Sequence, residues 1–139
     1  MRWPVNWLQA LVIGFFVTAW AALVVMVTVS PGVREVVVGR MPGSGAPMVI
    51  GFLVGLGCFL ALMTVGVLKL WRWVFWLVVV AFAAGAARVP IAWLQLTDRM
   101  APEGPDWYVA TQGVIGVVQV VIAVVMLVGY RRTGIWGLR

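Results

Sequence analysis

Long apolar blocks separated by short polar segments dominate this chain. The four blocks cover residues 6–29, 47–68, 72–96 and 107–130. Their apolar residues run on without a helix or strand period, and blocks of about 18 or more such residues are typical of transmembrane helices. Each block is long enough to cross a hydrocarbon core of about 30 Å with some tilt. We therefore predict an all-α integral membrane protein, with residues 1–139 forming one membrane domain.

The connecting segments predict how the four helices are joined. The first connection, SPGVREVVVGRMPGSGAP, is broken by Pro and Gly at both ends, and its centre, 33–39, fits a short interfacial strand or helix. The second, around KLWRW, is tight, and the third, TDRMAPEGPD, is polar. Short connections make sequential helices antiparallel neighbours, which predicts an up-down-up-down four-helix bundle. The first apolar block exceeds the roughly 7–15 residues of a signal-peptide hydrophobic region, so we expect it to be a membrane span.

The charged residues are few and unevenly distributed. Only 10% of the chain is charged, against about 25% in soluble domains. The net charge of +6 does not indicate nucleic-acid binding, because no soluble basic face exists to carry a phosphate footprint. Basic residues are more numerous on one side of the predicted membrane than on the other. The richer side has Arg2, Lys69, Arg72, Arg131, Arg132 and Arg139, and the poorer side has Arg34, Arg40 and Arg99. This bias predicts that both termini are cytoplasmic.

The excess of Arg over Lys, with abundant Ala, Val and Gly, is typical of a GC-rich prokaryotic genome, so we expect a multi-pass protein of the inner (plasma) membrane. Lys69, Arg72, Arg131 and Arg132 lie among tryptophans at the cytoplasmic boundary, where basic residues contact anionic headgroups. They are our candidate lipid-headgroup residues.

Small residues at spacings of three or four mark one face of each predicted span. Since lipid-embedded helices associate through close packing and not through hydrophobic burial, such faces predict helix contacts. The candidates for helix packing are Gly51 and Gly55, which form a G-x-x-x-G pattern, together with Gly85 and Gly116.

Arg88 is the one cation in the interior of a predicted span, since Arg72 lies at the first residue of its range, and Pro90 follows two residues later. Pro90 cannot donate to the carbonyl of Ala86, so a kink and a free acceptor are expected there. The antiparallel fourth span brings Gln112 to a similar depth, with Gln119 one heptad deeper, while Thr18 offers another acceptor in the first span.

Three interpretations of Arg88 remain open. It reaches the outer headgroups or pairs with Asp98 or Asp106 as a structural residue. Alternatively, Arg88, Gln112, Gln119 and Thr18 form a ligand-binding cavity for an anionic or polar molecule. In the third interpretation it contacts a carboxylate or phosphate on a partner subunit.

The chain lacks the residues of common membrane chemistry. It has no histidine, one cysteine (Cys58) and no acidic residue within a predicted span. Histidine-ligated metals or haem, paired-thiol redox chemistry and carboxylate proton relays therefore have no carrier. We expect no enzyme, no metal site and no cofactor.

Three functions follow as expectations. The first is a non-catalytic protein that acts by helix–helix interaction, as an accessory or stabilising subunit of a membrane assembly. The alternative is a small homo-oligomeric transporter or channel with an outward-facing polar vestibule. The third is a lipid- or hydrophobe-binding membrane protein. The expected partners are membrane lipids and either further copies of the chain or other membrane subunits, without nucleic acid.

Overall fold

The computed structural model describes residues 5–38, 45–102 and 104–137, and all regular structure within these ranges is helical. Four helical stretches are long and apolar enough to cross a membrane: Trp7–Val29, Ala46–Leu68, Arg72–Leu96 and Asp106–Thr133. Their ends differ from the predicted ranges by at most three residues. The prediction of four long apolar helices, each able to cross a membrane, is thus confirmed for the described residues. Arg2, Arg40 and Arg139, which entered the charge count, lie outside the described residues.

The spans correspond to α1 (Trp7–Val29), α3 (Ala46–Leu68), the α4–η1–α5 stretch and α6 (Asp106–Thr133). Within the third span, α4 (Arg72–Ala84) passes into a 3₁₀ turn, η1 (Gly85–Ala87), and then into α5 (Arg88–Leu96). The turn lies directly before Arg88, one helical turn ahead of Pro90. Because Pro90 has no N–H to offer the preceding turn, the α-helical ladder is interrupted where the sequence predicts a kink.

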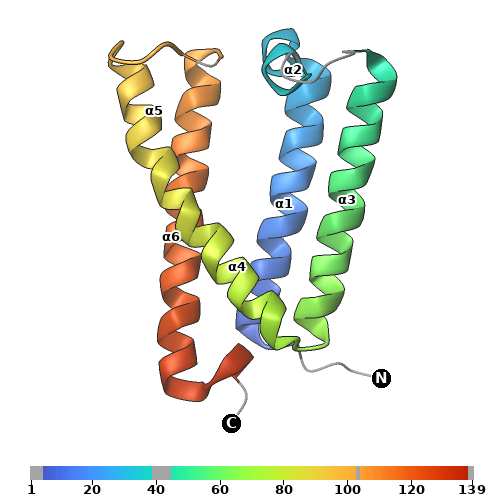
Figure 1. The fold of residues 1–139 in the computed structure, drawn as a ribbon, viewed down its shortest axis with the longest axis vertical. Coiled ribbons are helices and arrows are strands. Elements are labelled where there is room, and N and C mark those ends of the chain that lie inside the picture. The colour runs from blue at the N-terminus through green and yellow to red at the C-terminus, as the bar shows by residue number, and fades with distance from the viewer. Residues whose placement is uncertain (1–4, 39–44, 103, 138–139) are drawn as a thin grey trace.

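The spans associate as two antiparallel pairs, one of α1 with α3 and the other of α4–η1–α5 with α6 (Figure 1). The second pair is in contact along nearly its whole length, whereas α3 meets α4 only sparsely and α1 meets α6 only sparsely. This arrangement differs from the expected bundle, in which each helix would pack closely against the next. Figure 1 shows the two pairs diverging from the end at which the labelled termini lie.

The pairs are joined at that end by a buried core. Val74, Phe75 and Met126 are fully buried there, together with Trp136 of the terminal 3₁₀ turn η2 (Ile135–Gly137). The backbone turns back after α6 through Gly134, at φ 79°, and Trp136 itself has φ 58°.

Hydrogen bonds reinforce this core. The Asn6 side chain donates to the Trp136 carbonyl at 2.9 Å, and the Trp136 indole N–H donates to the Trp71 carbonyl at 3.4 Å. Gln9, also buried, donates from Nε2 to the Val67 carbonyl at 2.7 Å, which ties α1 to α3. Trp136, although it lies beside the basic end of α6, is therefore a core residue and not an exposed aromatic residue.

A short helix, α2 (Pro31–Val38), covers the opposite end. The segment that the sequence left open between strand and helix is therefore helical as far as Val38; Gly39 lies outside the described residues. Arg34 fixes α2 to the end of α1 by donating to the carbonyls of Val27 and Thr28, each at 3.1 Å.

The same short helix also reaches the second pair. A Cβ on Gly32 would lie 3.3 Å from Cγ of Pro105, and one on Gly104 would lie 3.2 Å from the Val36 side chain. Tyr108 of α6 is buried in one cluster with Val27 of α1 and Val33 of α2. The end distant from the termini is thus closed by α2 and by the residues around the start of α6.

Candidate functional site

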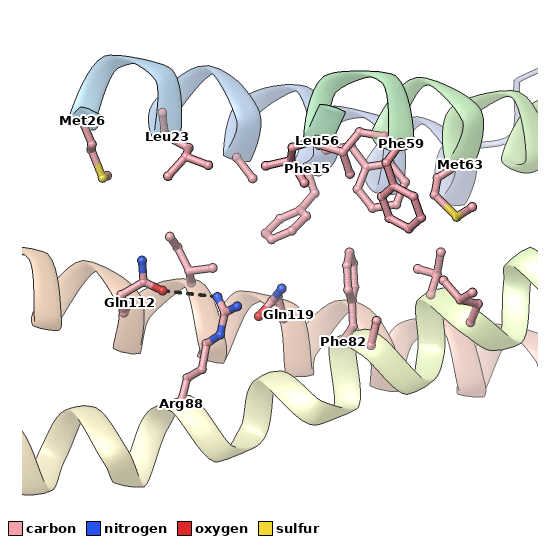
Figure 2. A pocket seen from close by; sticks show the side chains of 18 of the residues that line it. Phe15, Leu23, Met26, Leu56, Phe59, Met63, Phe82, Arg88, Gln112 and Gln119 are labelled. Atoms are coloured by element: carbon pink, nitrogen blue, oxygen red, sulfur yellow. Dashed lines mark hydrogen bonds between the residues drawn. The ribbon is translucent and has the colours of Figure 1, made fainter. Parts of the chain in front are cut away.

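A cavity of about 520 Å³ lies between the two helix pairs. The wall formed by α1 and α3 is apolar, and α4 continues this apolar lining toward the buried core. Polar side chains come from α5 and α6 alone (Figure 2). They are Arg88, Tyr108, Gln112 and Gln119. The cavity is therefore amphipathic, with one polar wall facing an apolar one.

Arg88 is the first residue of α5 and faces the cavity from beside α6 (Figure 2). Its Nη1 donates to Oε1 of Gln112 at 3.3 Å. Charge-assisted hydrogen bonds are usually about 2.7–2.9 Å long, so this contact is a weak one. A guanidinium carries five N–H donors, and among the described residues this is the one hydrogen bond that Arg88 makes. Most of its donor capacity remains free within the cavity.

Gln119 lies one heptad further along the same face of α6. Its Oε1 is buried and has no hydrogen-bond partner among the described residues. This oxygen packs against Gly85, where a Cβ would lie only 2.5 Å from it. Figure 2 shows the amide nitrogens of Gln112 and Gln119 turned toward the cavity. The glycine thus allows an amide to lie flat at the crossing, with its donors toward the open space.

The close crossing of η1 and α6 positions this polar wall. A Cβ on Gly116 would lie 2.8 Å from the Gly85 carbonyl oxygen and 3.0 Å from Cβ of Arg88. The helices therefore approach so closely at Gly116 that a side chain there would force the backbone at Gly85 to move. This contact holds Arg88 against α6, at the level of Gln112.

Thr18 does not join this site. It is exposed and lines a separate groove between α1 and α6, together with Gly14, Val117 and Val121. The cavity-facing positions of α1 include Phe15, Ala19, Ala22 and Met26, and Thr18 lies at the edge of this face, on the side toward α6. The structure therefore brings together Arg88, Gln112 and Gln119 of the predicted set but leaves Thr18 apart.

Gly51 and Gly55 face open space, since nothing lies within 4 Å of a Cβ built on either residue. The helix packing predicted for them thus has no counterpart among the described residues. Gly57 occupies the contact between α1 and α3 instead, with the Trp20 indole nitrogen 3.2 Å from its would-be Cβ. That indole also donates to the Leu53 carbonyl at 3.2 Å, which explains an aromatic residue in the middle of a span.

The four candidate headgroup residues are exposed and lie at the ends of helices. Lys69 caps α3, Arg72 begins α4, and Arg131 and Arg132 lie in the last turn of α6. The ring centroids of Trp76 and Tyr130 lie 5.3 Å apart, so these two side chains connect α4 and α6 near this end. These cations thus lie at the end of the molecule that carries the buried core.

Sequence reasoning missed two parts of the cavity. The first is Tyr108, which lies near the start of α6, is 9% exposed and lines the cavity. Its spacing of four residues from Gln112 places both on one helix face, and this was the available signal. The apolar wall from α1 and α3 had no such signal, because every face of these helices is apolar.

Comparison with known proteins gives no match to the chain among family models, curated proteins or solved structures. Among the described residues, no group of three or more His, Cys, Asp or Glu side chains could hold a metal ion. What the cavity does has to be inferred from its own geometry.

Proposed function

We propose that this multi-pass membrane protein is a non-catalytic binding protein whose cavity holds a membrane-soluble molecule with a polar head and an apolar body. The observation that carries the proposal is the polar wall of Arg88, Gln112 and Gln119 inside an otherwise apolar cavity. A volume of about 520 Å³ falls within the range of about 300–1,000 Å³ that small-molecule sites occupy. An arginine within a membrane span is costly, and such residues mark binding or transport pathways.

The same proposal assigns the membrane orientation. The end that carries Lys69, Arg72, Arg131 and Arg132 faces the cytoplasm of a prokaryotic cell, since basic residues are retained on that side. Both termini are then cytoplasmic, and the spans run up-down-up-down. In this orientation, the end closed by α2 faces outward. An outward-facing vestibule for a transporter or channel is less well supported, because α2 contacts the residues before α6 across that end.

Photocrosslinking tests the proposal. The protein is reconstituted in phosphatidylcholine nanodiscs with two probes, a long-chain alkyl phosphate and the matching alcohol, each with a mid-chain diazirine. We expect labelling on cavity-facing residues such as Phe15, Phe59 and Met63. Ala81→Trp, which fills the cavity, should remove it, and the control Ala83→Trp, on the same helix but outside the lining, should not. Labelling that is spread evenly over the lipid-facing residues, or that is unaffected by Ala81→Trp, would contradict the proposal.

A second candidate is the accessory subunit of a membrane assembly. The observation that favours it is the exposure of α3, of which only 6% is buried in its most apolar window. A helix of a partner subunit would then cover this surface. Stoichiometric release of the chain together with other polypeptides, measured by native mass spectrometry, would support this function, and release of the chain alone would contradict it.

A further inference from the structure

The polar wall of the cavity offers hydrogen-bond donors and a positive charge. Arg88 has unused N–H groups, and the Oε1 of Gln112 already accepts from it, which leaves the Gln112 amide nitrogen as a donor. The Gln119 nitrogen also faces the cavity (Figure 2), while its oxygen is turned against Gly85. Three residues therefore present donor groups along one wall of the cavity. Such a set is complementary to anionic oxygen atoms.

Within the part of the chain that the structure describes, no acidic side chain lines the cavity to balance this charge. The four acidic residues of the chain all lie in the connections or at a helix start, with Asp106 opening α6. A guanidinium within an apolar environment needs a counter-charge or several acceptors. Since Arg88 makes one hydrogen bond among the described residues, to the Gln112 amide oxygen, a ligand that brings an anionic group would provide the missing counter-charge.

The apolar part of the cavity extends from this region in one direction. Figure 2 shows Phe15 across the cavity from Gln119, Phe82 and Phe59 beyond it, and Met63 further along. These residues lead toward the buried core at which the helix pairs meet. An alkyl chain placed here would lie parallel to the helices, with its head at Arg88 and its tail toward the core.

The open side of the cavity faces the bilayer. Phe59 of α3 is 49% exposed and Leu77 of α4 is 40% exposed, and both line the cavity. These two helices touch only sparsely, near the turn that joins them (Figure 1). The outer end, by contrast, is covered by α2, Pro105 and Tyr108. Access between α3 and α4 suits a molecule that already resides in the membrane.

Resting on the proposed function, we infer that the ligand is a bilayer-resident anionic amphiphile, with a phosphate or carboxylate head on Arg88, Gln112 and Gln119. It enters between α3 and α4 and places its chain along the aromatic residues. Charge selects the ligand, and the apolar wall retains it.

The two photoactivatable probes test this inference when they are supplied separately. The alkyl phosphate should label cavity residues at least about tenfold more than the alcohol, since hydrogen bonds to charged groups contribute that much or more. Arg88→Gln should reduce labelling by the phosphate to the level of the alcohol, and Arg88→Lys should retain most of it. Thr18→Val, in the separate groove, is the matched control and should change nothing.

The outcomes separate the inference from the proposed function. If the alkyl phosphate and the alcohol label the cavity equally, and Arg88→Gln has no effect on labelling, the cavity binds amphiphiles but the inferred selection by charge is wrong. If neither probe labels the cavity, the proposed function fails as well. If inorganic phosphate at millimolar concentration displaces the alkyl phosphate from folded wild-type protein, the site recognises a free anion and the membrane-resident ligand is refuted. Gln112→Leu, which keeps the charge, should weaken labelling less than Arg88→Gln does.

Discussion

The crossing of η1 and α6 allows a quantitative test through Gly116→Ala. The added Cβ would lie 2.8 Å from the Gly85 carbonyl oxygen and 3.0 Å from Cβ of Arg88. The nearer neighbour is a backbone atom, which cannot swing aside as the end of a long side chain can. The two helices must therefore separate to accommodate one methyl group.

Two opposing terms set the size of the effect. Overpacking typically costs about 1–3 kcal/mol, while replacing Gly by Ala within a helix returns about 1 kcal/mol at most. Because the clash involves backbone, we place the cost near the top of its range and expect a net loss of about 1–2 kcal/mol. Gly85→Ala should cost less, since its Cβ meets the movable amide end of Gln119. Gly55→Ala, whose Cβ meets nothing within 4 Å, should be neutral or slightly stabilising.

The assay is reversible unfolding in mixed micelles, in which the SDS fraction is raised and the loss of helicity is followed by circular dichroism. Loosening the crossing should also move Arg88 away from Gln112 and weaken labelling by the alkyl phosphate. From most to least stable, the variants should rank Gly55→Ala, Gly85→Ala and Gly116→Ala. If Gly116→Ala is as stable as Gly55→Ala, the close crossing does not exist as described.

Three further substitutions test contacts within and between the helix pairs. Trp136→Ala should destabilise the protein by about 3–5 kcal/mol, because it empties a fully buried site; a thermal midpoint close to that of the wild type would refute the burial. Gln9→Leu removes the hydrogen bond to Val67 that joins the start of α1 to the end of α3, and also the acceptor of the Asn6 N–H, so it should cost about 1–3 kcal/mol in the same unfolding assay; a more stable variant would contradict this. Trp20→Phe loses the bond to the Leu53 carbonyl and should cost about 1 kcal/mol, whereas the exposed control Trp7→Phe should have no effect. Equal stability of these last two variants would argue against the indole contact.

The sequence predicts the spans well because a membrane-crossing helix must be long, apolar and interrupted by recognisable breakers. It also predicts the kink before Pro90. The pairing of Arg88 with Gln112 follows from counting residues inward from the helix ends, since antiparallel helices rise at a fixed rate per residue. These predictions depend on local geometry alone.

The lateral arrangement of the helices escapes such reasoning. In a span whose residues are almost all apolar, periodicity does not distinguish the face toward protein from the face toward lipid. The G-x-x-x-G pattern of Gly51 and Gly55 therefore predicted a contact on a face of α3 where no other residue lies within 4 Å, whereas Trp20 packs against Gly57. Thr18 was misplaced for the same reason. The burial of Trp136 depends on a backbone turn with positive φ at Gly134 and Trp136, and we did not predict this turn from the sequence.

Native mass spectrometry of the protein released gently from its own membrane tests the central claim most directly. The account predicts that the wild-type chain retains an anionic amphiphile and that the Thr18→Val variant does so equally. The Arg88→Leu variant should fold but lose this molecule, because the charge that holds the head is gone. Equal retention by Arg88→Leu, or a chain that carries no amphiphile and is released only with other subunits, would contradict the account.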